Sequence, residues 1–81
     1  MKPHEKAQQG LGLLKEAILD LLDQKSGGLR NAEIADILEI HSDYLGRQKD
    51  YFSWSIIGLL LNEGKVTKKD NRYFIAGKEA Q

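Results

Sequence analysis

Apolar residues recur at steps of three and four through the first part of the chain, with polar residues between them. The apolar positions are Ala7, Leu11, Leu14, Ile18 and Leu21. This spacing predicts an amphipathic helix over about residues 5–24. Gly10 and Gly12 each weaken a helix by about 1 kcal/mol relative to alanine, so a later start near residue 11 is the alternative. Gly27-Gly28 favours the end of this helix, because glycine adopts the left-handed capping conformation at little cost.

Two further helices are predicted after a short connection. Leu29-Arg30 is expected to form a short bridging strand, and Asn31 is expected to cap a helix over residues 32–39. A polar turn over residues 40–48 then leads to a strongly apolar helix over about residues 49–62.

Alternating polar and apolar positions near the C-terminus predict a β-hairpin. Gly64 is expected to stop the third helix. The strands cover residues 65–68 and 72–75 and face each other across Asp70-Asn71. Asp and Asn both tolerate the left-handed backbone of a tight hairpin turn.

Length and composition limit the remaining possibilities. The 81 residues predict a single domain over residues 1–81, with its core at about 11–76. The chain has no cysteine, and His4 and His41 are far apart in sequence, so we expect neither a metal site nor a cofactor. It has neither an apolar run of the ~20 residues that a membrane span needs nor the apolar segment of a secretory signal. A cytoplasmic, non-membrane protein is therefore the expectation.

The charges are balanced overall but unevenly distributed. The 12 basic and 12 acidic residues give a net charge of zero, whereas a dedicated DNA-binding protein is usually basic. Residues 1–45 carry 5 Lys/Arg and 8 Asp/Glu, a net of −3, and residues 46–81 carry 7 and 4, a net of +3. A basic half suits a protein that presents one face to phosphate. Chance clustering in a short chain is the alternative.

The order of elements and two motifs resemble the winged helix-turn-helix superfamily. The first motif, NAEIADIL at residues 31–38, is similar to that superfamily's second helix. The second motif, Ile57, Leu60 and then the run 63–66 (EGKV), is similar to its exit from the third helix into the wing. The resemblance implies an α+β winged helix-turn-helix fold, with three helices and a small antiparallel β-hairpin wing. Two features depart from the superfamily: Glu39 stands where a glycine is usual, and the third helix is unusually apolar.

A narrower resemblance covers part of residues 44–60. The runs Tyr44-Leu45-Gly46, Gln48-Lys49-Asp50-Tyr51, Ser53-Trp54-Ser55-Ile56 and Gly58-Leu59-Leu60 resemble winged-helix domains found in or beside restriction endonucleases of the Dam-replacing kind. This resemblance implies a role in recognising DNA, sometimes methylated DNA. The catalytic residues of such nucleases lie in a separate domain, so we expect none of them among these 81 residues.

The winged-helix resemblance implies that the start of the third helix reads bases in the major groove. The residues expected there are Arg47, Gln48, Lys49, Asp50 and Ser53. Arginine can bond guanine in a bidentate fork, glutamine can do the same for adenine, and Lys49 suits phosphate. The alternative is a solvated polar end of a loop.

A second basic cluster lies in the predicted hairpin. It consists of Lys65, Lys68, Lys69 and Arg72, which suit backbone phosphates or the minor groove. Lysines also protect exposed edge strands from aggregation, which is the alternative. Arg30 and Asn31, at the start of the second helix, are further candidates for a phosphate contact, although capping alone explains Asn31 equally well.

The third helix carries more apolar residues than one buried face can hold. The winged-helix resemblance implies that Ile57, Leu60 and Leu61 lie in the core. The surplus residues are Phe52, Trp54, Ile56 and Leu59. Three explanations stay open: the first helix and the wing cover them, they form a dimer or partner interface, or an aromatic side chain touches a thymine or a methylated base.

The sequence gives little support for catalysis. It shows no Ser/His/Asp set, phosphate loop or paired carboxylates in a cleft-like context. His41 follows the second helix, whose C-terminus favours a charged imidazole, but this position alone does not predict a pH-sensing role.

These observations predict a DNA-binding protein without enzymatic activity, acting as a small transcriptional regulator or as a recognition module. Its expected partner is double-stranded DNA, with homodimerisation or a larger protein complex as further options. The rival hypothesis is a winged-helix protein–protein interaction or assembly module that uses the apolar third helix. The neutral net charge favours this rival, and fold alone does not decide between the two.

Overall fold

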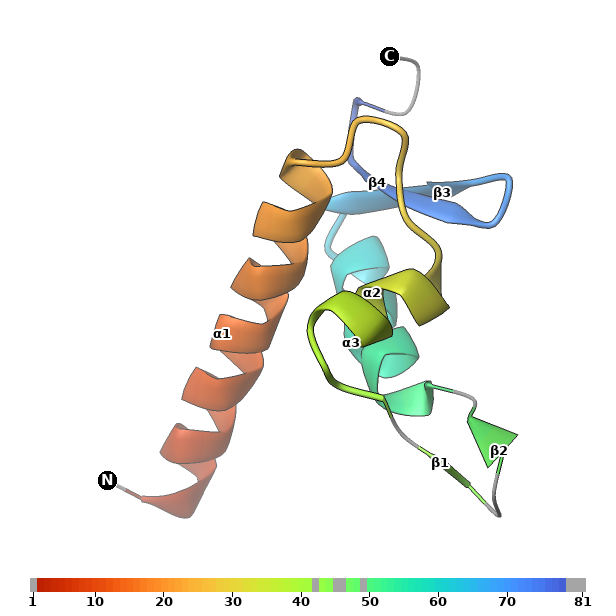
Figure 1. Ribbon diagram of the computed structural model, residues 1–81. Helices are drawn as coiled ribbons and strands as arrows, with labels where there is room; N and C mark the ends of the chain where they lie inside the picture. Colours follow the sequence, from red (N-terminus) through yellow and green to blue (C-terminus); the bar gives the residue numbers. More distant parts are fainter. Residues whose placement is uncertain (1, 42, 45–46, 49, 79–81) are drawn as a thin grey trace.

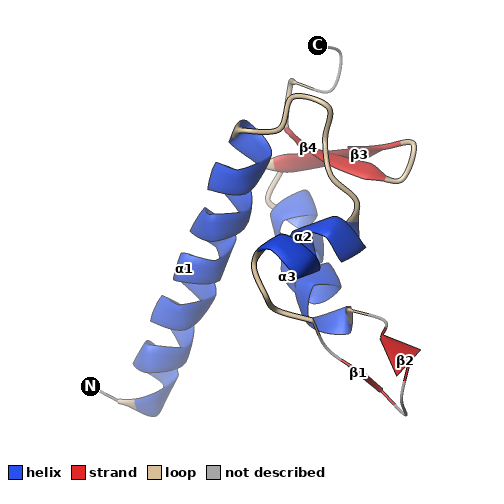
Figure 2. Cartoon of the chain, in the orientation of Figure 1, coloured by secondary structure: helices blue, strands red, loops and turns tan. Residues whose placement is uncertain are grey.

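A computed structural model describes residues 2–41, 43–44, 47–48 and 50–78, and for residues 43, 44, 47 and 48 it describes the backbone alone. Within these residues, three helices and two antiparallel hairpins form an α+β layout (Figures 1 and 2). In chain order the elements are α1 (Pro3–Asp23), α2 (Asn31–Ile37), β1 (Asp43–Tyr44), β2 (Arg47–Gln48), α3 (Tyr51–Asn62), β3 (Val66–Lys69) and β4 (Arg72–Ile75). In the part of the chain so described, no helix is both long enough and apolar enough to cross a membrane.

Helix α1 packs on the rest of the protein through its C-terminal half. It begins at Pro3, which suits a first helical turn because proline has no N–H to leave unpaired there. The helix continues through Gly10 and Gly12, so the alternative of a late start is wrong. Residues 2–10 are all exposed, and this end of the helix lies apart from the other elements in Figure 1. The buried residues of α1 are Ile18, Leu21 and Leu22.

The core lies where the three helices meet the β3–β4 hairpin. Helix α3 contributes Ile56, Ile57 and Leu60, whose spacing keeps them on one side of the helix. The predicted core positions Ile57 and Leu60 are therefore confirmed, whereas Leu61 is only half-buried and packs against the core. Ile56 is 4% exposed, so its predicted place in an interface is wrong: it lies on the inward side of α3.

The β3–β4 hairpin has the predicted turn. Its register pairs Val66 with Ile75 at the open end and Lys69 with Arg72 at the turn. Asp70 and Asn71 have φ angles of 53° and 64°, the left-handed pair that a two-residue hairpin turn requires. This confirms the prediction for Asp70-Asn71.

The connection before α2 joins this hairpin. Leu29 and Tyr73 form an antiparallel bridge, with N···O distances of 3.1 Å from Leu29 to Tyr73 and 2.7 Å in the reverse direction. The predicted bridging strand is thereby confirmed at Leu29. Asn31 is the first residue of α2 rather than its cap, so that prediction is wrong. Arg30 occupies the cap position in an extended conformation, and its backbone N–H donates to Glu33 Oε1 at 2.9 Å.

The segment between α2 and α3 differs from the predicted turn. Helix α2 ends at Ile37, and Glu39 has a φ of 57°, the conformation that glycine usually supplies after a helix. The short hairpin β1–β2 then pairs Asp43 with Gln48. Helix α3 begins at Tyr51 rather than near residue 49, because Asp50 has a left-handed φ of 54° that a helix cannot continue through.

Substitution of Gly28 tests how closely the segment before α2 packs against Phe74 of β4. The φ angle of Gly28 is +74°, and a Cβ atom there would lie 2.7 Å from the ring of Phe74. We expect Gly28→Ala to lower the free energy of unfolding by about 2 kcal/mol, from backbone strain and overpacking together. Gly27 is the matched control, because a Cβ there would meet nothing within 4 Å. Urea denaturation followed by circular dichroism measures both, and equal stabilities for the two variants would contradict this account of the packing.

Candidate nucleic-acid interface

A polar network joins the start of α3 to the start of α2. The main-chain oxygen of Asp50 accepts hydrogen bonds from Asn31 Nδ2 at 3.2 Å and from Ser53 Oγ at 3.1 Å. Ser53 Oγ also lies within hydrogen-bonding distance of Asn31 Oδ1. The side chain of Asp50 is only 6% exposed, so it is largely shielded from solvent where the start of α3 meets the start of α2. These contacts hold the start of α3 against the start of α2.

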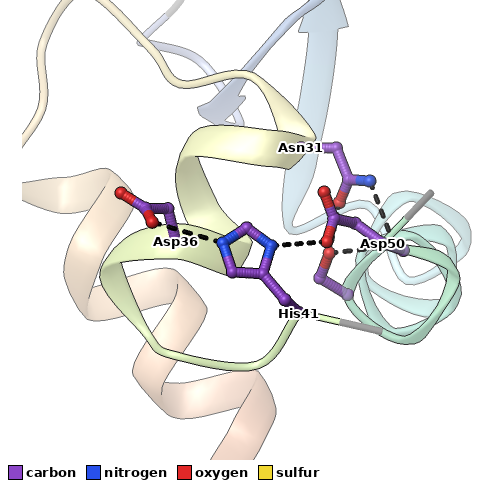
Figure 3. A network of polar contacts seen from close by, with 5 residues as sticks. Asn31, Asp36, His41 and Asp50 are labelled. Carbon is purple, nitrogen blue, oxygen red and sulfur yellow. Dashed lines mark hydrogen bonds and ion pairs between the residues drawn. The ribbon is translucent and has the colours of Figure 1, made fainter. Parts of the chain in front are cut away.

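His41 extends this network to the end of α2. Its Nδ1 lies 2.6 Å from Asp50 Oδ1 and its Nε2 lies 3.2 Å from Asp36 Oδ1, so the ring sits between two carboxylates (Figure 3). The hydrogen bond to Asp50, and then that to Asp36, raise the pKa of His41 above its ordinary value of 6.5, and they outweigh the opposing effect of burial. The two carboxylates therefore favour the charged form of the imidazole over the neutral form.

The positions of Asp50 and Ser53 differ from those predicted for residues that read bases. Ser53 is 0% exposed and Asp50 is nearly enclosed, so both residues help to join α3 to α2, and the prediction that they face bases is wrong. Arg47 and Gln48 lie on β2 rather than on α3, and the structure describes only their backbone. Lys49 lies outside the described residues. The sequence held a signal for Asp50 alone, since Asp is a typical residue at the cap position of a helix.

The outward side of α3 is aromatic and uncharged. Trp54 is 57% exposed, and Tyr51, Phe52 and Leu59 are exposed as well. Phe52 and Leu59 are exposed to 46% and 40%, and Ile56 is buried, so the first of the three explanations for the surplus apolar residues holds for Ile56 but not for Phe52, Trp54 and Leu59. The helix from Tyr51 to Asn62 contains no Asp, Glu, Lys or Arg. Binding of phosphate by α3 itself therefore has no cationic side chain to rely on.

The Leu29–Tyr73 bridge brings together basic residues that are distant in sequence. Arg30 follows Leu29, and extending the antiparallel register of the bridge by one residue puts it next to Arg72, which pairs with Lys69. The three residues occupy one row across three neighbouring chain segments, which we call the basic row. Neighbouring segments of a sheet lie about 4.8 Å apart, so the row spans roughly 10 Å. Arg30 and Lys69 are exposed and Arg72 is half-buried.

Several of the predicted phosphate-binding residues also make contacts within the protein. Arg72 Nη1 donates to the main-chain oxygen of Gly28 at 3.1 Å and lies 3.8 Å from Glu33 Oε1. The ammonium of Lys68 lies 5.6 Å from the centre of the Tyr73 ring, within the range of a cation–π contact. The sequence did not indicate these roles, because each depends on a partner brought close by the bridge or by the hairpin.

Lys65 is near an acidic neighbour. Its Nζ lies 3.7 Å from Glu63 Oε1, and Glu63 also accepts a hydrogen bond from Lys15 on α1. The bond from Lys15 lowers the pKa of Glu63 below its ordinary value. The positive charge of Lys65 is therefore partly balanced, and Arg30 and Lys69 are the better-placed cations for an external phosphate.

Comparisons of the chain with protein-family models, with curated proteins and with solved structures find no match. Among the described residues, no group of three His, Cys, Asp or Glu side chains is placed to hold a metal ion. The interpretation of the site therefore depends on its own geometry and charge.

The raised pKa of His41 makes the stability of the fold depend on pH. The protonated ring is favoured in the folded state, so its contribution is fully present below about pH 6.5, the ordinary value, and is lost as the pH rises through the folded-state pKa. We expect the melting temperature to fall between about pH 6 and pH 8.5 and expect His41→Gln to remove most of this fall. The other histidine, His4, is exposed near the start of α1, so His4→Gln is the control. An unchanged pH response in His41→Gln would show that the ring does not carry the effect.

Proposed function

We propose that this chain is a non-catalytic DNA-binding module with the arrangement of a winged helix-turn-helix. The observation that carries the proposal is the basic row, in which the Leu29–Tyr73 bridge sets Arg30 beside Arg72 and Lys69. Cations from two distant parts of the chain, Arg30 and the pair Lys69 and Arg72, thus come together near the turn of the β3–β4 hairpin. The layout of three helices and this hairpin is compatible with a winged helix, which supports the proposal.

In the proposed mechanism, the basic row contacts phosphates and α3 faces the major groove. Arg30 and Lys69 bind backbone oxygens and set the register of the protein on the duplex. The major groove admits either a helix or a two-stranded ribbon, so the β1–β2 hairpin, with Arg47 and Gln48, enters it beside the start of α3. Trp54, on the outward side of α3, meets the methyl group of a thymine, since such groups are recognised by apolar contact.

The small number of exposed cations sets the expected affinity for DNA in a protein of zero net charge. Each neutralised phosphate contributes about 0.9 to the slope of log K against log salt. With Arg30 and Lys69 from the basic row and Arg47 and Lys49 from the segment before α3 as the contacting cations, a slope of roughly 3 to 4 in magnitude is expected. Affinity for random duplex DNA should therefore be modest and detectable chiefly at low salt.

Removing the two exposed cations of the basic row tests this mechanism. We expect the double variant Arg30→Ala, Lys69→Ala to weaken binding on all sequences alike and to lower the salt slope by about two units. Both side chains are exposed, so the fold should be retained. Gel-shift titrations with random duplex DNA at about 50 and 200 mM salt measure the slope.

The control removes the same amount of charge at the far end of α1. Lys2 and Lys6 are exposed and belong to the N-terminal end of α1, and this end of the helix lies far from the β3–β4 hairpin in Figure 1. The variant Lys2→Ala, Lys6→Ala should bind DNA within about twofold of the wild type, since charges beyond a Debye length of about 10 Å are largely screened. An equal loss in both double variants would show that only the total charge matters, and no binding by the wild type at the lower salt would overturn the proposed function.

A second candidate function is protein–protein contact through the outward side of α3. Its support is the exposed, uncharged surface formed by Tyr51, Phe52, Trp54 and Leu59. Four such side chains offer a patch of a few hundred Å², whereas a stable interface buries about 800 Å² on each partner. Helix α3 alone would therefore give a weak contact. Such an apolar contact should respond little to salt, whereas binding to DNA should respond steeply.

Trp54→Ala separates the two uses of α3. Because Trp54 is 57% exposed, we expect the variant to stay folded, with a change in unfolding free energy within about 1 kcal/mol. If α3 contacts DNA, the variant binds duplex more weakly and its sedimentation is unchanged. If α3 contacts a second copy, the variant sediments as a smaller species at concentrations where the wild type associates. A variant that unfolds would contradict the outward placement of Trp54.

A further inference from the structure

His41 and Asp50 stand at the two ends of the segment that carries the β1–β2 hairpin. The hairpin register pairs Asp43 with Gln48 and Tyr44 with Arg47. His41 lies two residues before β1 and Asp50 lies two residues after β2. The 2.6 Å contact between His41 Nδ1 and Asp50 Oδ1 therefore closes the base of the hairpin.

The same ring also connects the base of the hairpin to α2. His41 Nε2 lies 3.2 Å from Asp36 Oδ1, and Asp36 is in the last turn of α2. Asp50 is in turn held by Asn31 and Ser53 through its main-chain oxygen. One imidazole thus links the end of α2, the base of the hairpin and the start of α3 (Figure 3).

The protonation state of His41 decides whether the ring can donate hydrogen bonds to both Asp36 and Asp50. A neutral imidazole has one N–H, so it can donate to one carboxylate, whereas the imidazolium ion donates to two. The titratable groups that face the ring among the described residues are Asp36 from α2 and Asp50 from the segment before α3. The Asp36 side chain is 78% exposed and that of Asp50 is 6% exposed. A ring that loses a proton should keep the shorter, enclosed bond to Asp50 and lose Asp36 to water.

We propose that charged His41 is a positioning residue for the DNA-binding face, because it holds the β1–β2 hairpin and the start of α3 against α2, and that loss of its proton weakens binding to duplex DNA. This inference rests on the proposed function, in which that hairpin enters the major groove. Binding to duplex DNA is therefore stronger at a pH where His41 is protonated and weaker at a pH where it is neutral.

The first experiment needs no DNA. Hydrogen exchange at the backbone amides of residues 43, 44, 47 and 48 is measured by NMR at about pH 6 and pH 8.5, with rates normalised to the intrinsic rate at each pH. We expect protection in the wild type to fall about fivefold on going to the higher pH, the lower end of typical coupling. His41→Gln should show the lower protection at both values, and His4→Gln should behave as the wild type. Equal protection in all three proteins at both values would overturn the role of His41.

The second experiment measures affinity for a fluorescein-labelled random duplex by anisotropy, at constant low salt and the same two pH values. We expect the wild-type dissociation constant to rise about fivefold at the higher pH, with His4→Gln unchanged from wild type. His41→Gln should bind weakly at both values. Asp36→Asn removes one partner from an exposed position and keeps the fold, and it should show a smaller pH response than wild type. A wild-type pH response in His41→Gln would overturn the proposal.

The two experiments distinguish the failure of this inference from the failure of the proposed function. Duplex binding with no dependence on His41, alongside a hairpin whose protection does change, would sink the positioning role and leave DNA binding intact. No duplex binding by any of the proteins at the lower pH would sink both the proposed function and the inference that rests on it.

Discussion

The two backbone hydrogen bonds between Leu29 and Tyr73 tie the segment between α1 and α2 to the C-terminal hairpin. Neighbouring features depend on this bridge. Gly28 must be a glycine because the ring of Phe74 lies where its side chain would be, and Arg72 can reach the main-chain oxygen of Gly28 because the two segments run side by side. The bridge also sets the sequence register that brings Arg30 to the hairpin. A pairing shifted by one residue would turn Arg30 inward and Leu29 toward water.

The parts of the fold that follow from local rules were predictable from the sequence. Asp70-Asn71 and Gly64 mark their turns because few other residues adopt left-handed backbone at low cost, and the structure has φ angles of that sign at all three. The core positions Ile57 and Leu60 followed from the winged-helix resemblance, and both lie within a single helix. Short sequence separation is common to all of these features.

The remaining features depend on partners distant in sequence. Ser53 is buried because Asn31, 22 residues earlier, is beside it, and no spacing rule connects the two. Hairpin β1–β2 has two residues in each strand, too few for an alternating pattern to be visible. The role of His41 likewise needs Asp36 and Asp50 on opposite sides of the ring. The binding partner of the protein does not follow from local sequence patterns for the same reason, since binding depends on a surface built from residues that are distant in sequence.

The projecting half of α1 has a consequence of a different kind. A helix of 21 residues is about 31 Å long, and its exposed residues 2–10 make up the outer part of that length. Short helical segments without tertiary packing are marginally stable in water, and this one includes Gly10, with Gly12 just beyond it. The order of this end of the chain is therefore governed by a helix–coil equilibrium rather than by the cooperative unfolding of the core, and it should melt gradually with temperature while the core remains folded.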